Sequence, residues 1–262
     1  MDKLQERVLL SYAAALEHGR TSSKKLIPMH KYYSELITDF VGKERNILSF
    51  SLGINDGKEK NVIRRNRDLY VIEKGEENGI IVEFRSTLSN LNQNKYNYLS
   101  EAIGDASIAK QNGYHYILIY EIPKQVPYFD NNGVIKGFEA TGAFVKNVIN
   151  EVNDAKSQLC RPTSVYFSIY EFTNIDEGVL IGKTASYYLD YIVKNAGVKR
   201  CDILNQLSNG DTVIVNDEKS MLAKINTTMD SVRSMRKYSA YMAKIGTLSL
   251  DQIEKIIENF NL

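Results

Sequence analysis

The 262-residue sequence contains no tryptophan, only two cysteines and only four prolines. Two isolated thiols, Cys160 and Cys201, cannot build a disulfide framework, and without a CxxC pair they predict no zinc site. So few prolines, with only 16 glycines, exclude collagen-like and low-complexity chains. No apolar run reaches the roughly 18 residues of a membrane-spanning helix. We therefore expect a protein with reduced thiols that acts in the cytoplasm and has no membrane partner.

Net charge is nearly absent as well, because 33 basic residues face 32 acidic ones and leave a formal charge of +1. This balance argues against a general nucleic-acid coat, which is normally basic, but it permits a local basic surface. The sequence has no P-loop, Rossmann glycine fingerprint or GxSxG elbow, and this excludes the corresponding enzyme classes. Its three histidines, His18, His30 and His115, share no metal-ligand spacing.

Hydrophobic periodicity predicts helix, three strands, helix, strand, helix and strand along the first two thirds of the chain. This order predicts an α/β fold in which helices flank both faces of a mixed central sheet. We expect residues 1–180 to form this core with its N-terminal helices, and residues 181–262 to form a mostly helical part for DNA reading or dimerisation. The expected helices are 3–17, 28–41, 96–111, 143–158, 184–195, 199–207, 219–233 and 250–260, and the expected strands are 46–52, 68–73, 80–85, 115–122, 164–172 and 212–215.

Two acidic residues stand at the ends of neighbouring expected strands. Asp68 begins the second strand, and Glu83 lies near the end of the third, across a hairpin-type connection. Two carboxylates at one sheet edge can hold Mg²⁺, which activates water and offsets charge on a phosphate. Arg85 shares the face of Glu83 because side chains on a strand alternate. The same spacing also fits a solvated Asp beside a structural Glu–Arg pair.

The residues that follow the two acids favour the interpretation of a Mg²⁺ site over that of a structural Glu–Arg pair. The stretch 83–106 reads Glu-Phe-Arg-Ser-Thr-Leu-Ser-Asn-Leu-Asn-Gln-Asn-Lys-Tyr-Asn-Tyr-Leu-Ser-Glu-Ala-Ile-Gly-Asp-Ala, and 113–123 reads Gly-Tyr-His-Tyr-Ile-Leu-Ile-Tyr-Glu-Ile-Pro. Over roughly residues 20–130 the chain resembles the PD-(D/E)xK nucleases, in particular a group of bacterial type II restriction endonucleases. The resemblance implies a restriction-endonuclease-like core and a Mg²⁺-dependent, sequence-specific double-stranded DNA endonuclease.

The resemblance also implies roles for individual residues. Asp68 and Glu83 match the two acids of the motif and would be metal ligands, with the backbone carbonyl of Phe84 as a third. Arg85 stands where the motif has lysine, which is a departure because a guanidinium is a planar fork that cannot be deprotonated. Two further catalytic candidates are Glu35, as an additional acid, and Lys95, as a displaced ammonium. A palindromic site would be read by a homodimer.

Candidate DNA-binding residues lie in three segments that combine cations with small hydrogen-bonding side chains. Such groups bind phosphate oxygens or base edges, although a solvated charge run or a polar turn has the same composition. The candidates are Ser22, Ser23, Lys24 and Lys25; Lys58, Lys60, Arg64, Arg65 and Arg67; and Ser89, Asn90, Asn92, Gln93 and Asn94.

The arginine at position 85 leaves a second hypothesis open, namely a catalytically degenerate nuclease fold that binds DNA or regulates without cutting. A third is a structural α/β interaction module with no DNA role. DNA cleavage separates the first hypothesis from the second, and DNA affinity separates both from the third.

Overall fold

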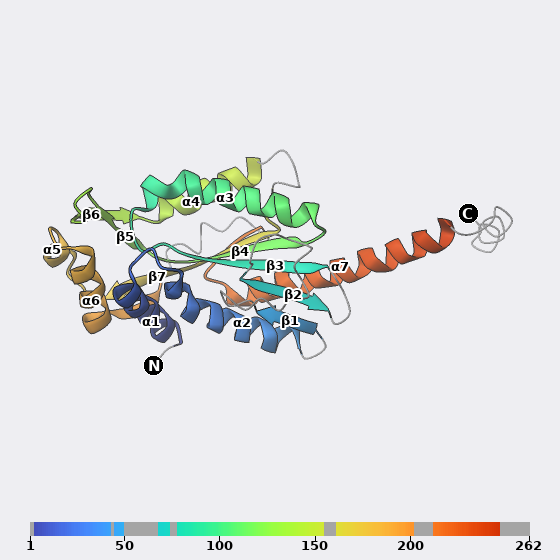
Figure 1. Ribbon diagram of the computed structural model, residues 1–262, viewed down its shortest axis with the longest axis horizontal. Coiled ribbons are helices and arrows are strands. Elements are labelled where there is room, and N and C mark those ends of the chain that lie inside the picture. The colour runs from blue at the N-terminus through green and yellow to red at the C-terminus, as the bar shows by residue number, and fades with distance from the viewer. Residues whose placement is uncertain are drawn as a thin grey trace.

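The computed structural model describes residues 3–42, 45–49, 68–73, 78–154, 161–201 and 212–246. A curled mixed sheet runs through the centre with helices on both faces, as the element order predicts (Figure 1). Its strands follow the order β1-β2-β3-β4-β7-β8, and β9 also pairs with β7. The strands are β1 Arg45–Ser49, β2 Leu69–Glu73, β3 Gly79–Ser86, β4 His115–Pro123, β7 Ser164–Thr173, β8 Gly197–Arg200 and β9 Val213–Val215.

The sheet changes direction at β3. Strands β1, β2 and β3 form an antiparallel meander, whereas β3, β4 and β7 are parallel. The connection from β3 to β4 runs through the long helix α3 (Leu91–Gln111) and that from β4 to β7 through α4 (Gly142–Asp154). Beyond β7, two short strands share one edge of the sheet: β8 is antiparallel to the end of β7, and β9 is parallel to its start.

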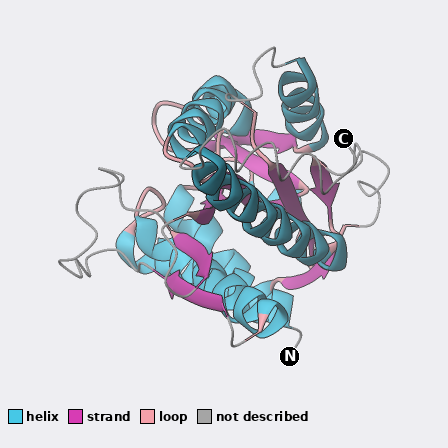
Figure 2. Ribbon diagram, turned by 90° about the vertical axis from the view of Figure 1, so that its right-hand side faces the viewer, coloured by secondary structure: helices cyan, strands magenta, loops and turns pink. Residues whose placement is uncertain are grey.

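Alternating side chains of the strands supply three buried clusters. Helices α3 and α4 pack on one face against Ile81 and Tyr116. Helices α2 (Ile27–Val41) and α7 (Glu218–Gly246) pack on the other face against Val82 and Phe84. The third cluster lies at the end of the sheet and contains α1 (Lys3–His18) and α6 (Ala185–Asn195), with the short helix α5 (Glu177–Leu180) beside them. Figure 2 shows helices on either side of the strands and α7 passing in front.

A group of charges, of which Arg7 and Glu121 are buried, connects α1 with α7 along one face of the sheet. The Arg7 guanidinium on α1 lies 2.7 Å from the Glu121 carboxylate on β4 and 3.6 Å from that of Glu218 on α7. Glu218 also pairs with Arg200 on β8 and accepts a hydrogen bond from the Tyr32 hydroxyl at 3.1 Å. These contacts connect α1, α2, β4, β8 and α7 on the α2 side of the sheet.

Several boundaries agree with the sequence prediction because they rest on local signals. Gly19 and Gly42 follow α1 and α2 with φ of +90° and +80°, a conformation that suits glycine, and Pro28 lies in the first turn of α2. Strand β9 and helix α6 lie where the sequence places them, and α7 continues thirteen residues past the predicted end at 233. The predicted helix 250–260 and the thiol of Cys160 lie outside the described residues.

One expectation is wrong, and one pair of strands was not expected. The predicted helix 199–207 begins in strand β8, where pairing with β7 over Tyr170–Thr173 overrides local preference, and the rest of that segment is outside the described residues. No strand was predicted between the end of β4 and α4, yet this stretch forms a two-stranded sheet, β5 (Gln125–Phe129) and β6 (Ile135–Ala140). A proline is tolerated there because Pro127 lies in a two-stranded ribbon, where its missing N–H costs little.

Helix α3 starts five residues earlier than the predicted Tyr96, because the β5–β6 ribbon supports its first turn. Asn90, with φ of +50°, accepts a hydrogen bond from the Phe129 N–H at 2.8 Å and donates to the Phe129 carbonyl at 3.2 Å. The Glu139 carboxylate accepts from the Asn92 N–H at 3.1 Å. Among the described helices, none is long and apolar enough to cross a membrane.

Candidate functional site

The sheet brings the two predicted acids onto neighbouring positions. The register of β2 and β3 pairs Leu69 with Val82, so that one step back along the same register Asp68 stands opposite Glu83. The Asp68 carboxylate accepts a hydrogen bond from the Phe84 N–H at 2.8 Å. The β2–β3 pair thus places Asp68 and Glu83 opposite each other, as the sequence predicts. The two residues lie where the antiparallel meander meets the parallel part of the sheet.

Arg85 is held between two buried carboxylates. Its guanidinium lies 3.4 Å from Glu83 and 3.4 Å from Asp105 on α3, and it donates to the Phe84 carbonyl at 3.3 Å. Burial lowers the pKa of Arg85, but the attraction of Glu83, supported by Asp68, outweighs it and leaves the pKa raised. Arg85 is therefore a fixed positive charge, and 26% of its side chain remains exposed.

The Tyr116 hydroxyl lies close to this group and is buried without a hydrogen-bond partner in the described part of the chain. Burial raises the pKa of Tyr116 well above its ordinary value, and the negative charge of Glu83 raises it further. A buried hydroxyl without a partner is uncommon and usually marks a place for water or another polar ligand. We call Asp68, Glu83, Arg85, Asp105 and Tyr116 the acid cluster.

Within the described residues, no three histidine, cysteine, aspartate or glutamate side chains are placed to hold one metal ion. Any cation at the acid cluster would therefore be held by two carboxylates and by water, which is a usual arrangement for Mg²⁺. The orphan hydroxyl of Tyr116 fits this arrangement, because it can accept from or donate to such a water. The Phe84 carbonyl, expected as a third ligand, accepts a hydrogen bond from Arg85.

Asp105 and Tyr116 of the acid cluster were not predicted, and neither was His30 beside it. Asp105 is 5% exposed on the face of α3 that also buries Ala102, Ala106 and Ala109, and a carboxylate on such an apolar face is a signal that the sequence does contain. His30 on α2 contacts the Asp68 backbone carbonyl through Nε2, and its ring lies 5.0 Å from that of Phe84. No spacing in the sequence connects His30 with position 68.

The structure does not bring the two additional catalytic candidates to the acid cluster. Glu35 is exposed on α2, the helix that covers the opposite face of the sheet. The Lys95 ammonium lies over the Tyr96 ring, 4.9 Å from its centroid. Lys95 is also ten residues from Asp105 on α3, which corresponds to about 15 Å along a helix.

The first group of DNA-binding candidates lies beside β3. Lys24 and Lys25, with Ser23, are in the short helix η1 (Ser23–Leu26), which contacts β3, and the Ser22 hydroxyl caps it by accepting from the Lys24 N–H. The Lys25 ammonium donates to the Arg20 carbonyl at 2.6 Å, and burial, with the charge of Arg20, lowers its pKa. Lys24 is the exposed cation of this turn.

The asparagine-rich group lies at the start of α3, and part of it is used to build the fold. Asn90 is bound to Phe129 as described above, and its amide also donates to Gln93 at 2.9 Å. Asn94 donates to the Asn90 carbonyl at 3.0 Å. Asn92 and Gln93 have exposed side chains, and Ser89 is half-buried. The basic candidates Lys58, Lys60, Arg64, Arg65 and Arg67 lie outside the described residues.

Comparisons of the chain with protein-family models, with curated proteins and with solved structures found no match.

Proposed function

We propose that the chain is a Mg²⁺-dependent, sequence-specific double-stranded DNA endonuclease with a restriction-endonuclease-like fold. The observation that carries this proposal is the placement of Asp68 opposite Glu83 across the β2–β3 pair, with Arg85 on the same strand. The order α2, β1, β2, β3, α3, β4 supports it, because it is the element order that the resemblance to PD-(D/E)xK nucleases implies.

Asp68 and Glu83 are the residues that would hold the metal, and water would complete its coordination. When bound, Mg²⁺ lowers the pKa of a bound water and offsets negative charge on the phosphate. A water molecule would attack phosphorus in line, the P–O3′ bond would break, and a proton on the leaving oxygen would complete a 3′-hydroxyl end opposite a 5′-phosphate end. The buried hydroxyl of Tyr116 orients water beside Glu83 in this scheme.

Arg85 has a different task from the lysine it replaces. It cannot take a proton from water, because a guanidinium stays charged throughout the working pH range. Its partly exposed fork can instead bind a phosphate oxygen, while Asp105 and Glu83 hold the fork in position. Asp105 is in this view a positioning residue that acts through Arg85.

The partners in this proposal are double-stranded DNA and a second copy of the chain, in the cytoplasm. The η1 turn with Lys24 contacts β3, the strand that carries Glu83 and Arg85, so the exposed Lys24 ammonium would bind the phosphate backbone near that strand. A two-fold symmetric dimer would present two acid clusters to the two strands of a palindrome.

The test uses purified full-length protein, unmethylated plasmid and Mg²⁺ or Mn²⁺, with metal binding measured separately by calorimetry. Asp68→Ala and Glu83→Gln should abolish cleavage and weaken metal binding, and the thermal unfolding temperature of each variant reports whether it folds. Glu151→Gln, an exposed acid on α4, is the matched control and should cut like the wild type. Wild-type protein that neither cuts any plasmid nor binds either metal would contradict the proposal.

The ion pairs of Arg85 favour one second candidate, a nuclease fold that binds DNA without cutting it. Because the guanidinium neutralises Glu83 and Asp105, it competes with a cation for the same carboxylate charge. An Arg85→Lys variant separates the two, since lysine makes a single compact contact and restores the motif. Salt-dependent DNA binding with no cleavage by either the wild type or this variant would favour the second candidate.

A further inference from the structure

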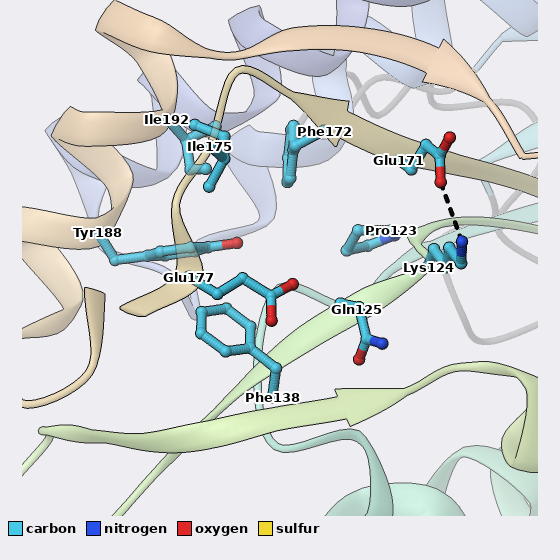
Figure 3. Close-up of a pocket in the computed structure, with 10 residues that line it drawn as sticks. All are labelled: Pro123, Lys124, Gln125, Phe138, Glu171, Phe172, Ile175, Glu177, Tyr188 and Ile192. Carbon is cyan, nitrogen blue, oxygen red and sulfur yellow. Dashed lines mark hydrogen bonds and ion pairs between the residues drawn. The ribbon is translucent and has the colours of Figure 1, made fainter. Parts of the chain in front are cut away.

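The structure contains a cavity of about 240 Å³ at the carboxyl ends of β4 and β7, outside the acid cluster. Its walls come from β4, β5, β6 and β7 and from helices α5 and α6, which are far apart in the sequence (Figure 3). The volume is below the roughly 300–1,000 Å³ of sites for drug-sized ligands. The cavity therefore suits a ligand of one or two rings, and we call it the ring pocket.

One side of the ring pocket is aromatic. Phe138 and Tyr188 line it with ring centroids 6.4 Å apart and ring planes tilted by 57°, and Phe172 is a third ring on its wall. Tyr188 is 2% exposed and belongs to the apolar third cluster, so its ring is fixed in place. Fixed rings of this kind favour a flat ligand that can contact their faces or edges.

The other side of the ring pocket is polar. Lys124 and Glu171 pair at 3.1 Å, and Lys199 pairs with the same carboxylate at 2.8 Å. Hydrogen bonds from Lys199 and Lys124 lower the pKa of Glu171, so its charge is fixed and already matched by two ammonium groups. The Tyr188 hydroxyl is paired with that of Tyr12 at 3.5 Å, which leaves Glu177 and Gln125 as the other hydrogen-bonding side chains of the lining. The Glu177 carboxylate extends between the aromatic and polar sides (Figure 3).

This combination of groups matches one chemical class. An ionised carboxylate only accepts hydrogen bonds, so Glu177 selects a ligand with an N–H donor, and Gln125 can donate and accept on the same edge. Carboxylates accept from the amino group of cytosine, and glutamine pairs with the amino group and ring nitrogen of adenine. Aromatic walls with such an edge are also how flipped bases are read.

The position of the ring pocket relative to the acid cluster is set by strand register. Arg85 pairs with Tyr120 on β4, and Pro123, which lines the ring pocket, lies three residues further along the same strand. At 3.3 Å per residue this is about 10 Å, a distance of about three base-pair steps along a duplex. A strand held at the acid cluster can therefore reach the ring pocket with a nearby base.

We propose that the ring pocket binds a single nucleobase that carries an exocyclic amino group, cytosine or adenine. The base comes from one of two sources, a free nucleoside or a nucleotide turned out of DNA, and only the second source rests on the proposed nuclease function.

The first arm of the test uses free nucleosides without DNA or metal. Calorimetric titration of the full-length protein compares cytidine and adenosine with uridine and inosine, which present a carbonyl in place of the amino group. We expect the amino-bearing member of at least one pair to bind about tenfold more tightly, as one charge-assisted hydrogen bond allows. Glu177→Gln should remove this preference, and Glu151→Gln should keep it.

The second arm uses 20-base-pair duplexes in which one cytosine, or one thymine, faces an abasic site, because an unpaired base is the least costly to extrude. Fluorescence anisotropy without divalent metal should show about tenfold tighter binding of the cytosine duplex, lost in Glu177→Gln. Phe138→Leu should weaken the binding of the nucleoside in the first arm and of the duplex in the second. The thermal unfolding temperature of this variant reports whether it folds. Discrimination in the first arm alone assigns a free nucleoside, and discrimination in the second assigns extruded DNA.

Absence of base preference in both arms with folded wild-type protein would overturn the proposal. The nuclease proposal would be unaffected by that result, because plasmid cleavage and metal binding by Asp68 and Glu83 are measured separately. Conversely, a chain that cuts no DNA can still discriminate between cytidine and uridine in the first arm.

Discussion

Replacement of Arg7 by methionine should destabilise the protein strongly. The Arg7 and Glu121 side chains are only 5% and 4% exposed and lie 2.7 Å apart. Methionine keeps the aliphatic packing over Tyr32, where the guanidinium now lies 3.9 Å from the ring centroid, but it removes the charge. Because the Glu121 carboxylate is then buried without its partner, we expect a loss of about 3–5 kcal/mol in the free energy of unfolding. Against the 5–15 kcal/mol typical of domains, this is a large fraction.

The loss should also depend on pH in a defined direction. Burial raises the pKa of Glu121, and Arg7 opposes that rise. Without Arg7 the pKa of Glu121 in the folded state rises further, so the folded variant binds a proton more tightly than the unfolded chain. Its stability is then greatest at low pH and falls as the pH increases through the folded-state pKa. The deficit relative to wild type should therefore be smaller at pH 5 than at pH 8.

Urea unfolding followed by circular dichroism at both pH values measures this effect. Lys194→Met is the matched control, because Lys194 pairs with Asp190 at 2.8 Å on the exposed surface of α6 and should cost only about 0.3–0.5 kcal/mol. Adding Glu121→Gln to Arg7→Met should recover part of the loss by removing the unpaired charge. A deficit below about 1 kcal/mol, or one that is equal at both pH values, would refute the reasoning.

Three further changes test other parts of the fold. Gly79→Ala would place a Cβ 2.1 Å from the Val71 carbonyl oxygen, so it should lower the free energy of urea unfolding by about 2 kcal/mol or more. Gly104→Ala lies in a helix with open space around its Cβ and should raise the free energy of unfolding. Equal effects of the two variants would contradict this. Burial, with the charges of Lys110 and Lys224, lowers the pKa of His115, so neutral His115 contributes stability at pH 7 that is lost as the pH falls through its folded-state pKa. In His115→Asn, the free energy of unfolding should therefore change less between pH 7 and pH 5 than in the wild type. An equal change in both proteins would contradict the assignment. Asp217 accepts from the Ser220 N–H at 3.1 Å and hydroxyl at 2.6 Å at the start of α7; Asp217→Ala should cost about 1 kcal/mol, and no loss in the melting curve would contradict a capping role.

The central sheet was predictable because its strands carry strong local patterns. The run from His115 to Ile122 is apolar and bounded by Gly113 and Pro123, and the structure extends it by only one residue. The meander from β1 to β3 followed from its turn residues and alternation. Asp68 and Glu83 could be placed together for the same reason, because a hairpin converts sequence spacing into register.

The elements that failed depend on pairing between distant segments. Strand β8 has only four residues and takes its conformation from β7, so a window of sequence around Lys199 reads as helix. Pro127 argued against a strand, so the β5–β6 ribbon was not predicted. The start of α3 was predicted too late for the same reason, because this ribbon supports its first turn. Asp105 on α3 leaves a signal in the sequence, a carboxylate on an apolar helix face, but nothing in the sequence names Arg85 as its partner. His30 reaches the hairpin from α2, and no local pattern reports that contact.

The charges around Arg7 also bear on the order in which the protein can fold during synthesis. Arg7 pairs with Glu121 and Glu218, which are made much later, and Glu218 in turn binds Tyr32 and Arg200. Contacts between such distant residues close long loops and form slowly. During synthesis, α1 leaves the ribosome long before Glu121 and Glu218, the two acids that pair with Arg7. A chain stopped before Glu218 would keep the Glu121 pair but leave Arg200 and the Tyr32 hydroxyl without the acid that joins both ends of the protein.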